Sequence, residues 1–180
     1  MEVNKIHKYF RWLIYIFELY FLYSLEQNPI LSVGFFGARP LLLVSAFVSI
    51  ALFEKEYTGM AFGVLTGMLL DFSFGNSLGI YALLLCILGY TLGVLSTYFF
   101  RCNFWTALVS TALITSAIVA LRFYFNYILP QFENKSFAWM NFCVPIIIYS
   151  VALTPIIFLF NRSISYFVNA GGGQNKIRLS

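Results

Sequence analysis

The residues best suited to chemistry lie between positions 75 and 79. Gly75, Ser77 and Gly79 fit the GxSxG pattern, which in hydrolases presents a nucleophilic serine. Such a serine needs a general base within hydrogen-bond reach. The only histidine, His7, lies in the basic N-terminal arm, and the topology inferred from the charges places it across the membrane from Ser77. We therefore predict no catalytic site and no enzyme activity, with the serine belonging to a turn.

Metal and cofactor chemistry has little support in the sequence. The three cysteines form no CxxC motif and lie in or beside apolar segments, where small buried side chains are the simplest interpretation: Cys86, Cys102 and Cys143. A single histidine cannot form a histidine cluster. No P-loop, GxGxxG or HExxH motif is present, and the basic residues are dispersed. We predict no metal, no cofactor and no nucleic-acid partner.

Five glycines and one carboxylate recur at intervals of four residues: Gly59, Gly63, Gly67, Asp71, Gly75 and Gly79. Glycine at every fourth position gives a helix a flat strip on which a second helix can lie closely within a bilayer. Packing within the chain's own bundle is the favoured interpretation. A docking face for a separate transmembrane helix is the alternative, and both can hold on different faces of the helix.

Charged residues inside apolar segments are costly in a bilayer and therefore invite pairing. Arg39 and Asp71 are expected near the external ends of adjacent helices, where an ion pair would lower the cost of each. Glu18 and Arg122 are the other intramembrane ions. We predict a structural pair between them, with an ion or proton pathway as the weaker alternative because two residues provide few relays.

The composition indicates an integral membrane protein. Of 180 residues, 61% are hydrophobic and only 10% are charged, whereas soluble domains carry about 25% charged residues. We expect a single membrane domain over residues 1–165, with a basic cytoplasmic N-terminal arm. Residues 166–180, which contain three consecutive glycines, are expected to form a flexible cytoplasmic tail.

Six apolar segments are candidates for membrane-spanning helices, and the first is expected to be retained rather than cleaved as a signal peptide. They cover residues 9–25, 40–53, 57–72, 78–100, 104–128 and 137–160. Pro40 is expected to begin the second helix, because proline suits a first helical turn. The second and third segments are short for a span. Pro145 and Pro155 interrupt the last segment.

The distribution of lysine and arginine favours a topology with both termini in the cytoplasm. With six spans, eight basic residues fall on the side of the termini, namely Lys5, Lys8, Arg11, Lys55, Arg101, Arg162, Lys176 and Arg178. Only Arg39 and Lys135 fall on the other side. Cytoplasmic loops carry the excess of basic residues, so this division supports six spans over five.

Several motifs together resemble the rod shape-determining protein MreD family, especially members from Gram-positive bacteria. Residues 37–40 read Gly-Ala-Arg-Pro and open an apolar helix, and the glycine strip follows at residues 59–79. Tyr-Ala-Leu at 81–83 and Leu-Gly-Tyr-x2-Gly at 88–93 complete the pattern. The resemblance covers roughly residues 8–165, and its most specific part is residues 37–93.

The resemblance implies an all-α bundle of six transmembrane helices, similar to the substrate-binding subunits of energy-coupling-factor transporters. It implies a non-catalytic scaffold in the bacterial cytoplasmic membrane that binds the single-span protein MreC. The associated elongation machinery contains the actin-like MreB, the glycan polymerase RodA and its transpeptidase. Gly59, Gly63 and Gly67 would then form the close-packing surface for the MreC helix. A vitamin-binding transporter subunit is the alternative function, disfavoured by the scarcity of polar intramembrane side chains.

Overall fold

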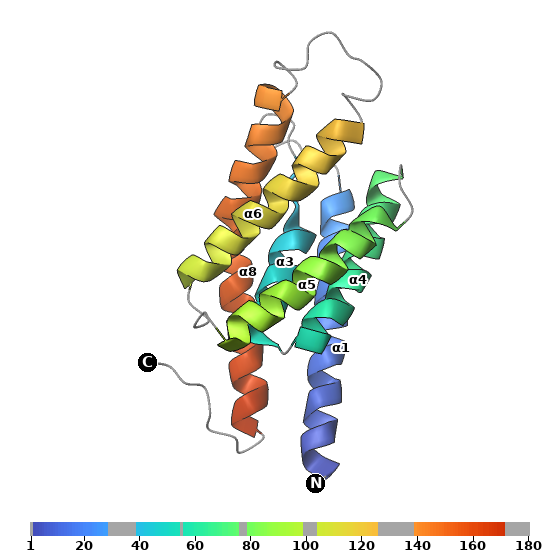
Figure 1. Ribbon diagram of the computed structural model, residues 1–180. Helices are drawn as coiled ribbons and strands as arrows, with labels where there is room; N and C mark the ends of the chain where they lie inside the picture. Colours follow the sequence, from blue (N-terminus) through green and yellow to red (C-terminus); the bar gives the residue numbers. More distant parts are fainter. Residues whose placement is uncertain are drawn as a thin grey trace.

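Six α-helices and one π-helical turn account for nearly all of the described residues of the computed structural model, which are 2–28, 39–54, 56–75, 79–98, 104–125 and 139–171. The elements are α1 (Glu2–Gln27), α3 (Leu42–Phe53), α4 (Glu56–Phe74), α5 (Ile80–Tyr98), α6 (Phe104–Phe123), η2 (Trp139–Cys143) and α8 (Val144–Gly171) (Figure 1). The prediction of an all-helical membrane protein agrees with this architecture.

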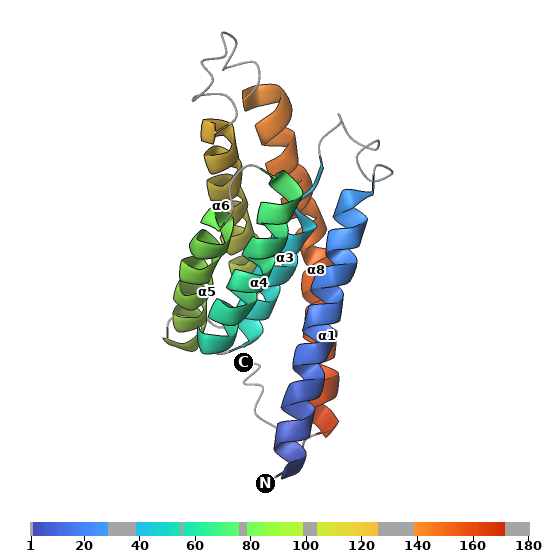
Figure 2. The ribbon, with the colours of Figure 1, turned by 90° about the vertical axis from the view of Figure 1, so that its right-hand side faces the viewer.

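Helix α3 lies at the centre of the bundle and contacts each of the other five α-helices (Figure 2). Every residue from Leu42 to Leu52 is buried. The sequence of α3 is apolar on all faces, broken only by two serines, and a helix of that kind belongs inside a protein or a membrane. Its 12 residues extend about 18 Å, well short of the ~30 Å hydrocarbon core of a bilayer.

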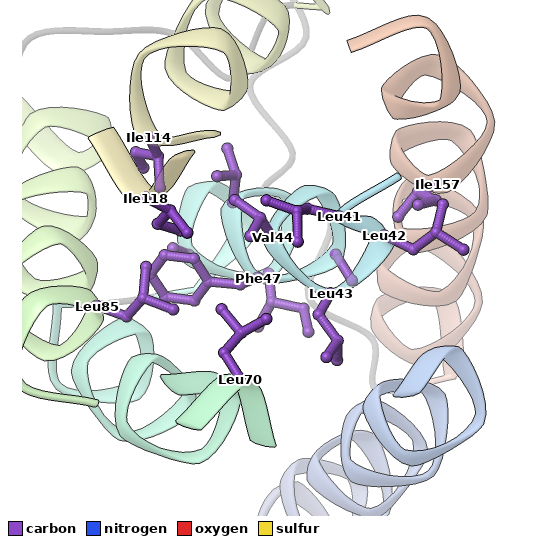
Figure 3. Packing of buried hydrophobic residues seen from close by; sticks show 14 of the residues in the cluster. Leu41, Leu42, Leu43, Val44, Phe47, Leu70, Leu85, Ile114, Ile118 and Ile157 are labelled. Atoms are coloured by element: carbon purple, nitrogen blue, oxygen red, sulfur yellow. The ribbon is translucent and has the colours of Figure 1, made fainter. Parts of the chain in front are cut away.

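The core is built around the side chains of α3. Phe47 is fully buried, and Figure 3 shows its ring near Leu70 of α4, Leu85 of α5 and Ile118 of α6. On the side of α8, Leu42 lies close to Ile157. One apolar cluster therefore joins α3 to helices from both halves of the chain.

The outer surface of the bundle is strongly apolar. Large side chains point outward from several helices, including Phe17 of α1, Phe72 of α4 and Trp105 of α6. Within the described residues, three helices are long and apolar enough to cross a membrane, namely residues 80–98, 104–123 and 144–166, and α3 is a shorter apolar helix. An outward-facing apolar surface next to such helices fits a protein whose solvent is lipid.

The helix bounds differ from the prediction mainly in the first and last helices, and α1 begins at Glu2 rather than near residue 9, so the expected basic arm is helical. Helix α8 continues to Gly171, well beyond the expected end near residue 160, so the first residues of the expected tail are helical. Pro145 lies in the first turn of α8, where its missing N–H costs nothing, while Pro155 lies inside the helix. The start of α1 and the end of α8 lie at the same end of the bundle (Figure 1).

Candidate helix-packing site

Helices α4 and α5 meet backbone to backbone along the glycine strip. A Cβ atom added to Gly59 would lie 2.8 Å from the carbonyl oxygen of Gly89. A Cβ on Gly63 would collide with the backbone carbonyl of Leu85, and one on Gly67 with the backbone of Ala82. All three glycines are buried. The absence of side chains is therefore what permits this contact, since backbone atoms cannot move aside as a flexible side chain can.

The facing helix also contributes small residues. Gly89 of α5 lies against the carbonyl group of Gly59, and a Cβ on Gly93 would lie 2.6 Å from the Cα atom of Glu56. Close approach of this kind maximises van der Waals contact, which drives association between helices in a membrane. In this structure α5 covers the strip formed by Gly59, Gly63 and Gly67, so that face is occupied by the chain itself.

Gly75 and Gly79 do not belong to the packing strip, although they continue its four-residue spacing. Helix α4 ends at Phe74, and both glycines adopt positive φ angles of 66° and 93°. Within the described part of the chain, no atom lies within 4 Å of a Cβ added to either glycine. The N–H of Gly75 donates to the carbonyl of Asp71, as expected for a glycine that terminates a helix. Their role is conformational, so the prediction that they pack against a helix was wrong.

The carboxylate of Asp71 binds the start of α5. Asp71 is only 4% exposed, and its two oxygens accept hydrogen bonds from the N–H groups of Gly79, Tyr81 and Ala82 at 3.1, 3.3 and 3.2 Å. The first N–H groups of a helix have no partner within the helix, and the helix dipole favours a negative charge there. Asp71 thus joins the end of α4 to the beginning of α5.

The predicted pair between Arg39 and Asp71 is not formed. Both residues belong to the described part of the chain, and no ion pair joins them. Asp71 is satisfied by backbone donors, and Arg39 is exposed. Pro40 also lies outside the helix that it was expected to begin, because α3 starts at Leu42.

Glu18 and Arg122 are likewise apart. The Glu18 carboxylate accepts a hydrogen bond from the side-chain amide of Asn161 at 2.7 Å. Arg122 lies in the last turn of α6, with its guanidinium 4.2 Å from the centre of the Phe74 ring. This distance is typical of a cation–π contact. The positions of these two charges along their helices could not be compared from the sequence alone.

An ion pair that the sequence analysis did not identify joins α1 to the end of α3. Arg11 and Glu54 make two contacts, from Nε to Oε1 at 2.7 Å and from Nη2 to Oε2 at 3.0 Å. Glu54 is buried. Spacing could not reveal this pair, because its members are 43 residues apart.

Side chains from three other helices satisfy the ends of α3. The N–H of Leu41 donates to Ser150 Oγ at 2.8 Å, and the N–H of Leu43 donates to Glu26 Oε2 at 3.4 Å. At the other end, Ser96 Oγ donates to the carbonyl of Leu52 at 2.7 Å. A buried helix end needs such partners, since water cannot provide them. These contacts fix the short central helix at both ends.

Comparison with known proteins decides the family. The family model described as rod shape-determining protein MreD matches residues 6–168. The chain belongs to the MreD family. No curated protein and no solved structure matches it. The resemblance seen in the sequence is thereby confirmed, and this MreD protein is a cell-shape-determining membrane protein. The similarity to transporter subunits and the count of six membrane spans remain predictions.

Proposed function

We propose that this MreD protein is a non-catalytic scaffold of the bacterial cell-wall elongation machinery, located in the cytoplasmic membrane with both termini in the cytoplasm. In this role it binds the transmembrane helix of MreC and positions it relative to RodA, its transpeptidase and MreB. The family match over residues 6–168 carries the proposal. The apolar outer surface supports a role that is carried out by contact within the membrane.

The partner helix needs a face that α5 does not cover. Helix α6 packs against α8 and α3. The second half of its remaining surface carries small residues, with Ser116 half-buried and Ala117 and Ala120 exposed, whereas the first half carries the exposed side chains of Val109 and Leu113. Small residues at an exposed position allow a second helix to approach closely. The outer face of α1 is bulkier, with Phe17 and Phe21 exposed. We therefore assign the MreC helix to the small-residue face of α6, defined by Ser116, Ala117 and Ala120.

The experiment is recovery of MreC from membranes with a tagged form of this protein. Ala120→Leu should greatly reduce the MreC recovered while leaving the amount of inserted tagged protein unchanged. Ala61→Leu is the matched control, because Ala61 is exposed on α4, and it should recover MreC normally. Failure of the unmodified protein to recover MreC would contradict the scaffold proposal. Normal recovery with Ala120→Leu would contradict only the assignment to α6.

A further inference from the structure

A buried acidic side chain on α1 meets a buried amide on α8. Glu18 is 6% exposed and Asn161 is fully buried. Asn161 Nδ2 donates to Glu18 Oε1 at 2.7 Å and to the carbonyl oxygen of Ile157 at 3.3 Å. Because both partners accept, the two hydrogens of the amide nitrogen are used. The orientation of the Asn161 amide is therefore fixed, with Oδ1 as its other polar atom.

Two oxygens of this pair have no hydrogen-bond donor among the residues that the structure describes. Glu18 Oε2 and Asn161 Oδ1 are both buried and unpartnered. A buried acceptor without a donor costs about 1–3 kcal/mol, and more when it is charged. Both acceptors belong to side chains that already share one hydrogen bond. A single donor between them would satisfy both.

The charged groups around the pair do not supply that donor. On α1, Arg11 pairs with Glu54 at the end of α3, and the buried hydroxyl of Tyr15, one turn before Glu18, forms no hydrogen bond with any described residue. On α8, Arg162 follows Asn161 in sequence and is exposed. The charged residues of α4, Glu56 and Asp71, lie near its two ends. In the part of the chain that the structure describes, no cation forms an ion pair with Glu18.

We propose that Glu18 and Asn161 together form a proton-binding site, in which Glu18 Oε2 carries the proton and donates it to Asn161 Oδ1. The proton comes from water, and the carboxylate becomes a neutral carboxylic acid. The acid and the amide then form a ring of two hydrogen bonds, in which each side chain donates once and accepts once. This arrangement gives both unpartnered oxygens a hydrogen bond. It also neutralises a charge that would be costly inside the bundle.

The proposal makes glutamine a structural equivalent of the protonated residue. In Glu18→Gln the amide nitrogen replaces the protonated oxygen and can donate to Asn161 Oδ1 in the same place. Glu18→Ala removes both hydrogen bonds and leaves the Asn161 amide buried. We expect Glu18→Gln to keep the thermal stability of the purified protein, and Glu18→Ala to lower its melting temperature. A lower melting temperature for Glu18→Gln than for Glu18→Ala would contradict the proposed ring of hydrogen bonds.

The decisive measurement is infrared difference spectroscopy of the purified protein at neutral pH. The chain has only seven acidic residues, so subtracting the spectrum of Glu18→Gln isolates one of them. We expect the carbonyl band of a protonated carboxyl group to be present in the unmodified protein and lost in Glu18→Gln. If the difference shows instead the bands of a carboxylate, Glu18 is charged and the proposal fails. A bridging water or a bound sodium ion would give that result.

A second variant gives a result that does not depend on how well Glu18→Gln folds. Asn161→Leu retains the acid but removes its acceptor. The carbonyl band of the protonated carboxyl group should then persist and shift to higher frequency, because Glu18 has lost its hydrogen-bond partner. An unshifted band would show that Asn161 is not the acceptor. Disappearance of the band in the unmodified protein on mild alkalinisation, without unfolding, would show that the proton is weakly held and would also overturn the proposal.

Discussion

The backbone of Gly59 on α4 lies directly against the backbone of Gly89 on α5. A Cβ on Gly59 would come within 2.8 Å of the Gly89 carbonyl oxygen, and Gly89 is equally constrained by Gly59. The contact is reciprocal, so neither helix can carry a larger side chain at this point without separating the two. It makes α4 and α5 a tightly joined pair within the bundle.

Substitution in the glycine strip should separate these two helices. Gly63→Leu would drive a side chain into the backbone of Leu85. We expect destabilisation of at least the ~1–3 kcal/mol typical of overpacking, because backbone cannot be repacked. The measurement is the thermal unfolding midpoint of the purified protein in detergent. Ala61→Leu, on the exposed face of the same helix, should leave the midpoint unchanged. Equal midpoints for the two variants would contradict the packing described above.

Removal of the Asp71 carboxylate should destabilise the start of α5. Asp71→Ala leaves the N–H groups of Gly79, Tyr81 and Ala82 without their acceptor. By analogy with helix caps, the expected loss is about 0.5–2 kcal/mol. Asp71→Asn keeps one acceptor oxygen and should lose less. The faster amide hydrogen exchange expected in Asp71→Ala at Gly79, Tyr81 and Ala82 would identify the affected region.

The charge swap Arg39→Asp with Asp71→Arg separates capping from ion pairing. Because Asp71 serves backbone donors, the double variant should be no more stable than Asp71→Arg alone. Recovery of stability in the double variant would show that the two side chains pair after all.

The hydroxyl group of Ser150 should contribute more to the stability of the protein than its small size suggests. Its hydroxyl accepts the N–H of Leu41 and donates to the carbonyl of Ile146. Ser150→Ala would leave the buried Leu41 N–H without a partner, at a cost of about 1–3 kcal/mol. Ser150→Thr keeps the hydroxyl and should be milder. Thermal unfolding of both variants checks this, with Ser163→Ala as a control, since Ser163 is an exposed serine of the same helix. A similar loss of thermal stability in Ser163→Ala would show that Ser150 has no special role.

The sequence was sufficient to predict the helices but not their lateral contacts. Apolar length located the six α-helices of the described residues, because long apolar segments bounded by turn residues are typical of helices in membrane proteins, although the start of α1 and the end of α8 were misplaced. The four-residue glycine spacing predicted close packing correctly for Gly59, Gly63 and Gly67. It failed for Gly75 and Gly79, since spacing alone does not show where a helix stops.

The polar contacts were less predictable. Asp71 was expected to pair with Arg39, but its partners are backbone groups that no side-chain pattern records. Glu18 binds Asn161, which is 143 residues away. A pairing over such a distance depends on how α1 and α8 are placed and rotated around α3, and one sequence does not contain that information.

The short central helix also constrains how this protein can be made. When residues 42–53 leave the ribosome, α5, α6 and α8 have not yet emerged from it, so most of what encloses α3 is absent from the membrane. At ~1.5 Å per residue the segment is too short to bridge the bilayer on its own. Its final position must therefore be reached late, after the C-terminal helices have entered the membrane. Truncation after α5 should accordingly leave this segment exposed to the cell's membrane proteases and chaperones, even though its own residues are intact.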